Sequence, residues 1–164
     1  MSSTTNTETT TQKTLSGLIN AIHQVETGGK LGPTRGDGGN ALGPLQIHRA
    51  CWQDSKISGR YSQCADLEYS KRVFRAYMKR YATEKRLGRV PTNEDMARIW
   101  NGGPNGWRKS ATIKYWNKVK CVLKNDTQFP VKTAINHSSM VNAAMNVKDF
   151  TMRKTNESFN CLRV

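Results

Sequence analysis

The chain has 164 residues, of which 36% are hydrophobic, and this suffices for one modest core in a single domain with tails. Lys and Arg outnumber Asp and Glu by 26 to 12, and the formal net charge of +14 predicts a polyanionic partner: nucleic acid, an anionic membrane surface or an anionic cell-wall polymer. No apolar stretch approaches the length of a membrane span, and the polar N-terminus does not have the form of a secretory signal peptide.

Residues 1–13 are rich in Ser and Thr, and we expect them to form a disordered polar tail. In residues 15–26, apolar side chains recur at the spacing of a helix: Leu15, Leu18, Ile19, Ile22 and Val25. The glycines after Thr27 should end this helix, which leaves Glu26 at its C-terminal end. The helix dipole and burial both disfavour a negative charge there, so we predict a raised pKa for Glu26. Glycoside hydrolysis needs such a protonated carboxyl group as its general acid.

Residues 28–43 are rich in Gly and predict a loop with a small β-hairpin. Asp37 lies in this loop, where polar surroundings should keep its carboxylate ionised. The following residues 44–47 predict a short strand, in which Leu45 and Ile47 alternate with Gln46. Leu45 and Ile47 can then contribute to the core while Gln46 and the adjoining backbone line a ligand groove.

A longer helix is predicted from residue 65 or 66 to residue 81, with one apolar and one basic face. Tyr77 lies on the apolar face, so a core role and a hydroxyl group that reaches the groove both remain open. Residues 92–95 resemble a capping box, with Asp95 in place of Glu, and predict a short helix. This helix leads into a tight turn containing Asn101, Gly102 and Gly103, which is either a helix connection or a wall of a sugar-binding groove.

A last core helix is predicted from about Ser110 to residue 122. Residues 124–164 form a basic C-terminal extension, with one short helix around residues 140–145. None of the four cysteines belongs to a CxxC pair, which argues against a zinc site; disulfides and reduced thiols both remain open. The predicted fold is mainly α, with one small Gly-rich β element.

Six strings, in this order along residues 15–123, together resemble the invertebrate-type lysozyme family. They are Glu26-Thr27-Gly28-Gly29, residues 37–47 (DGGNALGPLQI), Trp52-Gln53-Asp54, residues 77–82 (YMKRYA), residues 97–106 (ARIWNGGPNG), and Ala111-Thr112 with residues 115–119 (YWNKV). The resemblance implies an α+β lysozyme-like fold, with residues 14–123 as the catalytic domain.

By this resemblance the chain is a lysozyme that hydrolyses the β-1,4 bond between N-acetylmuramic acid and N-acetylglucosamine in bacterial peptidoglycan. Glu26 would be the general acid and Asp37 the nucleophile or electrostatic stabiliser, with Asp54 in reserve. Gln46, Leu45, Ile47, Tyr77, Asn101, Gly102 and Gly103 would form the substrate-binding residues.

The resemblance implies no metal or cofactor. It implies a monomer that contacts peptidoglycan and anionic cell-wall polymers, with no specific nucleic acid. The alternatives are a lytic transglycosylase or chitinase on the same fold, or a non-catalytic cationic module that binds the cell wall. The lack of a signal peptide suggests a virus- or phage-borne protein, release by another route, or a removed leader.

Overall fold

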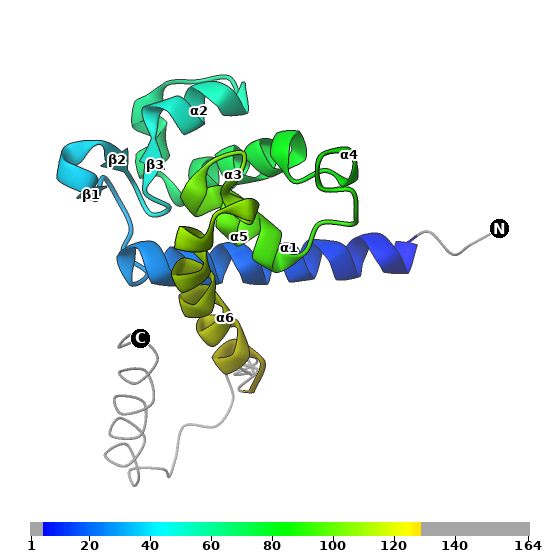
Figure 1. Ribbon diagram of the computed structural model, residues 1–164. Helices are drawn as coiled ribbons and strands as arrows, with labels where there is room; N and C mark the ends of the chain where they lie inside the picture. Colours follow the sequence, from blue (N-terminus) through cyan, green and yellow to red (C-terminus); the bar gives the residue numbers. More distant parts are fainter. Residues whose placement is uncertain (1–4, 129–164) are drawn as a thin grey trace, which may run out of the picture. The chain divides into compact units, whose positions relative to one another are not determined.

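The computed structural model describes the backbone of residues 5–128 and the side chains of residues 15–125. Helices dominate this part of the chain (Figure 1): α1 (Thr5–Thr27), α2 (Arg49–Ser55), α3 (Leu67–Tyr81), α4 (Glu84–Leu87), α5 (Asn93–Gly102) and α6 (Ile113–Gln128). Short 3₁₀ turns complete it: η1 (Asp37–Gly39), η2 (Tyr61–Ala65), η3 (Gly106–Arg108) and η4 (Ser110–Thr112). The predicted mainly α architecture is confirmed.

The predicted β element is a small antiparallel sheet inside the Gly-rich segment. Strands β1 (Arg35–Gly36), β2 (Ala41–Leu42) and β3 (Ile47–His48) are hydrogen-bonded in this order. Arg35 pairs with Leu42, and Leu42 pairs in turn with Ile47. This register buries Leu42 and Ile47 while His48 remains exposed.

Helix α1 begins at Thr5, ten residues before the helix predicted from residue 15. The prediction of a disordered tail is therefore wrong for residues 5–13, whose backbone is helical. No Gly or Pro lies between Thr5 and Ser16, so no residue there breaks the helix. At the other end, Gly28 and Gly29 adopt positive φ angles of 64° and 79°, which stop the helix directly after Thr27. The predicted position of Glu26 on the last turn of a helix is therefore confirmed.

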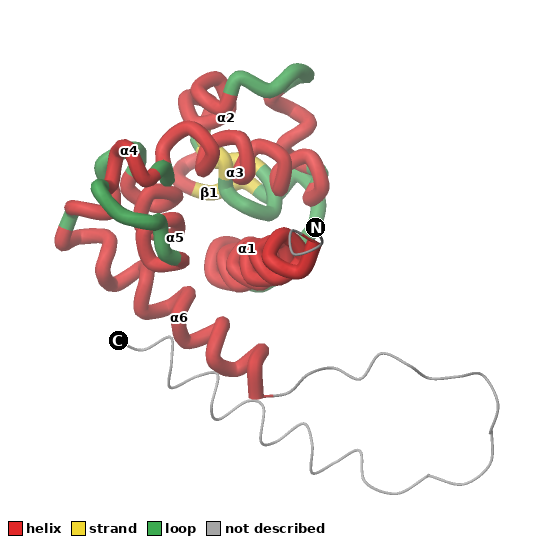
Figure 2. The backbone as a smooth tube through the Cα atoms, turned by 90° about the vertical axis from the view of Figure 1, so that its right-hand side faces the viewer, coloured by secondary structure: helices red, strands yellow, loops and turns green. Residues whose placement is uncertain are grey.

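The core forms around α1, which supplies the fully buried Leu18, Ile19 and Ile22. Figure 2 looks along α1 and shows α3 and α5 beside it; these two helices contribute Phe74 and Ile99 to the same core. Full burial of each such side chain stabilises the fold by about 1.5–3 kcal/mol relative to exposure. The end of α1 that carries Glu26 is thus part of a well-packed framework.

Two predicted helix starts are confirmed in atomic detail. The Asp66 carboxylate caps α3 by accepting a hydrogen bond from the Tyr69 backbone N–H at 2.7 Å. At the start of α5, the Thr92 hydroxyl accepts from the Asp95 N–H at 3.2 Å, and the Asp95 carboxylate accepts from the Thr92 N–H at 2.8 Å. This is the reciprocal pattern of the predicted capping box.

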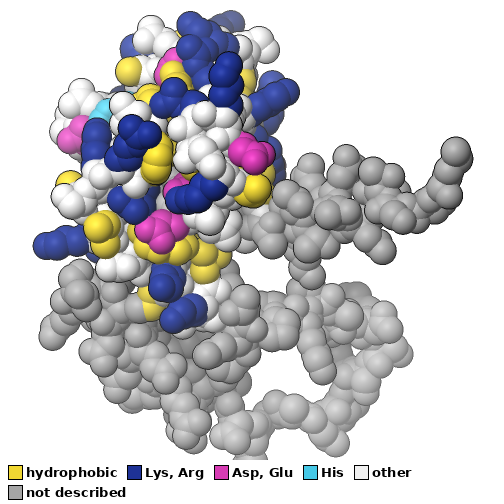
Figure 3. Space-filling view, turned by 45° about the vertical axis from the view of Figure 1, so that its right-hand side comes forward, with side chains coloured by type: hydrophobic (Ala, Val, Ile, Leu, Met, Phe, Trp, Pro, Cys, Tyr) yellow, Lys and Arg dark blue, Asp and Glu magenta, His cyan; other side chains and the backbone are white. Residues whose placement is uncertain are grey.

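On the face that Figure 3 shows, Lys and Arg side chains are scattered among other side chains rather than gathered in one patch. Cys51 and Cys64 are free thiols, and Cys121 is disulfide-bonded. In the part of the chain that the structure describes, no helix is long and apolar enough to cross a membrane. The helix predicted around residues 140–145 lies outside the described residues.

Candidate active site

Glu26 is held by the contacts of the turn that follows it. The Thr27 hydroxyl lies 3.1 Å from the carbonyl oxygen of Pro44 and 3.3 Å from that of Lys30. The Lys30 carbonyl is also 2.9 Å from Nε2 of the buried His23, one turn before Glu26. These contacts join the end of α1 to the loop on one side and to the β element on the other.

The Glu26 carboxyl group is partly buried, and the Tyr115 hydroxyl donates a hydrogen bond to its Oε1 at 2.7 Å. Burial raises the pKa of Glu26, and the Tyr115 hydrogen bond opposes part of that rise by favouring the ionised form. The predicted rise is confirmed, with burial as its largest cause. Glu26 therefore retains its proton to higher pH than an exposed glutamic acid does.

Asp37 has a different environment. It opens η1 between β1 and β2, with a positive φ of 47°, and its side chain is 66% exposed. Its Oδ2 lies 3.6 Å from Nε2 of His48, the exposed residue at the end of β3. The sheet thus places an imidazole group beside Asp37, whereas Glu26 lies against a neutral phenol group.

After both carboxyl groups in the chain, residues 43–46 form a turn, in which Gln46 has a positive φ of 49°, so the strand predicted over residues 44–47 is wrong except at Ile47, the first residue of β3. The predicted alternation of buried and exposed side chains nevertheless holds. Leu45 and Ile47 are buried in the core, and Gln46 is partly exposed between them. The Gln46 amide nitrogen donates to the carbonyl oxygens of Gly43 at 2.8 Å and Thr34 at 3.3 Å. Gln46 therefore braces the β element, and any ligand contact from this segment comes from Gln46 and the backbone rather than from the two apolar side chains.

Helix α5 continues through Asn101 and Gly102, so the turn predicted to contain them begins only at Gly103; Asn101 is exposed, and Gly102 and Gly103 are partly buried. Lys109 Nζ donates to the carbonyl oxygen of Gly102 at 2.7 Å, which fixes the turn from the following segment. Tyr77 is buried, with its ring centroid 6.1 Å from that of Trp100. The packing of Tyr77 agrees with the core role that was left open for it.

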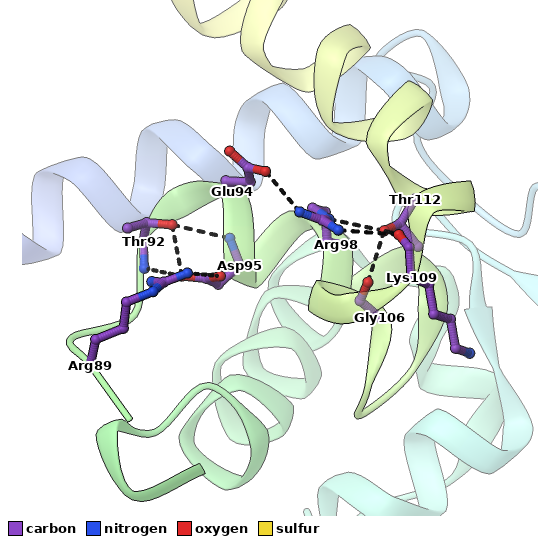
Figure 4. A network of polar contacts seen from close by, with 8 residues as sticks. All are labelled: Arg89, Thr92, Glu94, Asp95, Arg98, Gly106, Lys109 and Thr112. Atoms are coloured by element: carbon purple, nitrogen blue, oxygen red, sulfur yellow. Dashed lines mark hydrogen bonds and ion pairs between the residues drawn. The ribbon is translucent and has the colours of Figure 1, made fainter. Parts of the chain in front are cut away.

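A polar network joins α5 to the start of α6 (Figure 4). Arg98 donates to the Thr112 hydroxyl at 3.0 Å, to the Lys109 carbonyl at 3.1 Å and to the Glu94 carboxylate at 2.8 Å. The buried Thr112 hydroxyl also lies 2.8 Å from the Gly106 carbonyl. This network fixes the residues directly before α6, the helix that carries Tyr115.

Asp54, the reserve candidate, has structural partners. Its carboxylate accepts a hydrogen bond from the Tyr81 hydroxyl and pairs with Arg80 at 3.4 Å, which joins α2 to α3. Among the described residues, no three His, Cys, Asp or Glu side chains are grouped in a way that could hold a metal ion.

The sequence reasoning missed two neighbours of these carboxyl groups, Tyr115 and His48. Tyr115 lies 89 positions from Glu26 and belongs to the sixth lysozyme-like string, which was the one available signal for it. His48 follows the Pro44–Ile47 segment directly, and only the strand register places it near Asp37.

Comparisons with known proteins agree with the sequence motifs. The model of the Destabilase family matches residues 16–122. "Lysozyme 1" of Crassostrea virginica is 42% identical over 83 residues, which is 49% of this chain and 44% of that protein. The "Invertebrate-type lysozyme" of Ruditapes philippinarum is 39% identical over 102 residues, 59% of this chain and 73% of that protein. The chain thus spans less than half the length of the first relative and about three quarters of the second.

Solved structures are also similar. The Meretrix lusoria lysozyme, in a complex with Aeromonas hydrophila PliI, superposes with a TM-score of 0.56 at 34% identity, over 63% of this chain and 86% of that chain. The Tapes japonica lysozyme has the same TM-score at 30% identity, over 73% of this chain and 94% of that chain. Because the family model covers more than half of the sequence, the chain belongs to the Destabilase family, that of the invertebrate-type lysozymes.

Proposed function

We propose that this protein is a lysozyme that hydrolyses the β-1,4 bond between N-acetylmuramic acid and N-acetylglucosamine in bacterial peptidoglycan. The observation that carries the proposal is the environment of Glu26: a partly buried carboxyl group with a raised pKa at the end of α1, in a chain of the invertebrate-type lysozyme family. Two carboxyl groups in contrasting environments are the usual requirement of glycoside hydrolysis.

In the proposed reaction, Glu26 donates its proton to the glycosidic oxygen as the bond from that oxygen to the anomeric carbon breaks. The Asp37 carboxylate attacks the anomeric carbon or stabilises its positive charge. The Glu26 carboxylate then takes a proton from water, whose oxygen bonds to the anomeric carbon as any bond from that carbon to Asp37 breaks and the Asp37 carboxylate is restored. This second step releases the sugar and restores the protonated Glu26.

Substrate contacts are proposed from two further segments. Gln46 and the adjoining backbone of Leu45 and Ile47 would supply one set of hydrogen bonds. Asn101 and the backbone of Gly102 and Gly103 would supply another. The net charge of +14 would draw the enzyme to the anionic cell wall, an attraction that added salt should weaken.

A second candidate is a lytic transglycosylase, which works with one carboxyl group. The exposure of Asp37 and its pairing with His48 favour this alternative, because neither feature requires Asp37 to touch a sugar ring. The two candidates differ in their products: hydrolysis gives reducing ends, whereas the transglycosylase reaction gives anhydro sugars.

The test is clearing of a peptidoglycan suspension by the wild type, E26Q, D37N and D54N, with mass spectrometry of the released sugars. E68Q is the matched control, since Glu68 is an exposed residue of α3 paired with Lys71. A lysozyme should lose activity in E26Q and D37N and keep it in E68Q and D54N. Anhydro products and an active D37N would indicate the transglycosylase. An active E26Q would contradict both enzyme proposals.

A further inference from the structure

The hydrogen bond between Tyr115 and Glu26 distinguishes the two oxygens of the Glu26 carboxyl group. The Tyr115 hydroxyl donates to Oε1 at 2.7 Å, a short distance typical of a strong hydrogen bond to a carboxylate. With Oε1 occupied as an acceptor, the proton of the neutral acid belongs on Oε2. The contact therefore decides which oxygen carries the proton.

We propose that Tyr115 is a positioning residue for Glu26, which directs the acid proton to Oε2 and stabilises the carboxylate that remains after this proton is transferred. The inference rests on the proposed function, in which Glu26 is the general acid. It adds a residue to that mechanism which touches Glu26 rather than the substrate.

The place of Tyr115 in the fold suits this role. Tyr115 lies on the first turn of α6, three residues after Thr112. Thr112 is buried and held by Arg98 of α5, so the start of α6 is anchored to the helical core (Figure 4). The donor thus reaches Glu26 from a fixed helix, which is the preorganisation that electrostatic catalysis requires.

The charge state of Tyr115 also suits its role as a hydrogen-bond donor to Glu26. Burial and the neighbouring Glu26 raise the pKa of the Tyr115 hydroxyl well above its usual value, so it remains a donor when Glu26 ionises. The influences on the Glu26 pKa are burial, which raises it, and Tyr115, which lowers it. His23, one turn earlier on α1, has its Nε2 at the Lys30 carbonyl.

These opposing influences give an unusual expectation for Y115F, which removes only the hydroxyl oxygen. Without the hydrogen bond, Glu26 should titrate at higher pH and be a weaker acid. The alkaline limb of the pH–activity profile should move to higher pH, while kcat/KM at the optimum falls about tenfold, the effect of one hydrogen bond to a charged group. A merely structural role of Tyr115 predicts no change in the titration of Glu26.

The test compares wild type, Y115F and Y69F, using the ¹³C chemical shift of the Glu26 carboxyl group (assigned with E26Q), the pH profile and the melting temperature. Y69F is the matched control, because the Tyr69 hydroxyl donates to the Ser58 carbonyl at 3.0 Å and accepts from the Trp52 indole at 2.9 Å, contacts that do not include Glu26. Y115F should move the Glu26 titration upward, and Y69F should change only the melting temperature.

An unchanged Glu26 titration in Y115F would overturn the inference, even if activity fell. If Y115F does not fold, site-specific 3,5-difluorotyrosine at position 115 replaces it: a more acidic phenol is a stronger donor and should move the titration downward, and an unmoved midpoint would again refute the proposal. The failure of the proposed function has a different signature, since E26Q would then retain wild-type lysis whatever the titration of Glu26 shows.

Discussion

The Thr112 hydroxyl offers a sharp test of how α6 is fixed, because T112V removes the hydroxyl group at nearly constant volume. The Arg98 Nε–H, at 3.0 Å, and the Gly106 carbonyl, at 2.8 Å, then lose this partner, whereas the Lys109 carbonyl, 2.7 Å from the same hydroxyl, keeps its hydrogen bond from Arg98 (Figure 4). Thr112 is 3% exposed, Gly106 is buried and Arg98 is partly buried. An unsatisfied buried group costs about 1–3 kcal/mol, and the partial burial of Arg98 favours the lower part of this range, so T112V should lower the free energy of unfolding by about 2–4 kcal/mol.

T112S is the matched control, since it keeps the hydroxyl and loses one methyl group, at a cost of about 0.8 kcal/mol. The assay is urea unfolding followed by far-UV circular dichroism, with an unchanged m-value required for the comparison. For a chain of this size, the T112V loss corresponds to a drop of roughly 6–12 °C in melting temperature. A T112V protein as stable as T112S would refute the argument that this hydroxyl anchors α6.

The remaining predictions concern a glycine and a buried carboxylate. Gly43 has a φ of 81°, and a Cβ there would lie 1.7 Å from the Cys64 carbonyl oxygen, so G43A should cost more than about 2 kcal/mol in urea unfolding. G88A is the control, because Gly88 has a similar φ of 74° but no atom within 4 Å of an added Cβ, and it should cost about half as much unfolding free energy. Equal losses in G43A and G88A would contradict the role of the contact with the Cys64 carbonyl. Burial alone would raise the pKa of Asp95, but hydrogen bonds from Arg89 and Thr92 lower it. The ionised Asp95 therefore stabilises the fold at neutral pH, and this contribution is lost as pH falls through the lowered pKa. The difference in unfolding free energy between wild type and D95N should accordingly become smaller in acid. A difference that does not change with pH would refute this role of the Asp95 carboxylate.

Much of the fold was predictable because its signals are local. The cap of α3 at Asp66 and the capping box of α5 depend on residues only three positions apart. The end of α1 was marked by Gly28 and Gly29, which adopt the backbone conformation that glycine favours. Helices α2 and α4, with seven and four residues, were missed because such short segments carry too little hydrophobic periodicity to be recognised.

The candidate site was predictable only in part, because some of its contacts are local in the chain and others are not. The raised pKa of Glu26 follows from its place at the end of an apolar helix, which the spacing of apolar residues in α1 reveals. The balance that sets this pKa is not local. It depends on Tyr115, which the chain brings back to Glu26 only after the β element and four further helices have been placed.

This non-local contact explains why a family motif can indicate a site residue that physical reasoning on the sequence overlooks. The helical spacing of Ile113, Trp116 and Val119 marks Trp116 as the aromatic residue of the apolar face, and it gives no signal for Tyr115, although both lie on the first turn of α6. The role of Tyr115 appears only when α6 is anchored by Thr112 and Arg98, because that anchoring directs Tyr115 rather than its neighbour to Glu26. If the argument is right, T112V should disturb the titration of Glu26 as well as the stability of the fold, whereas T112S should leave this titration unchanged.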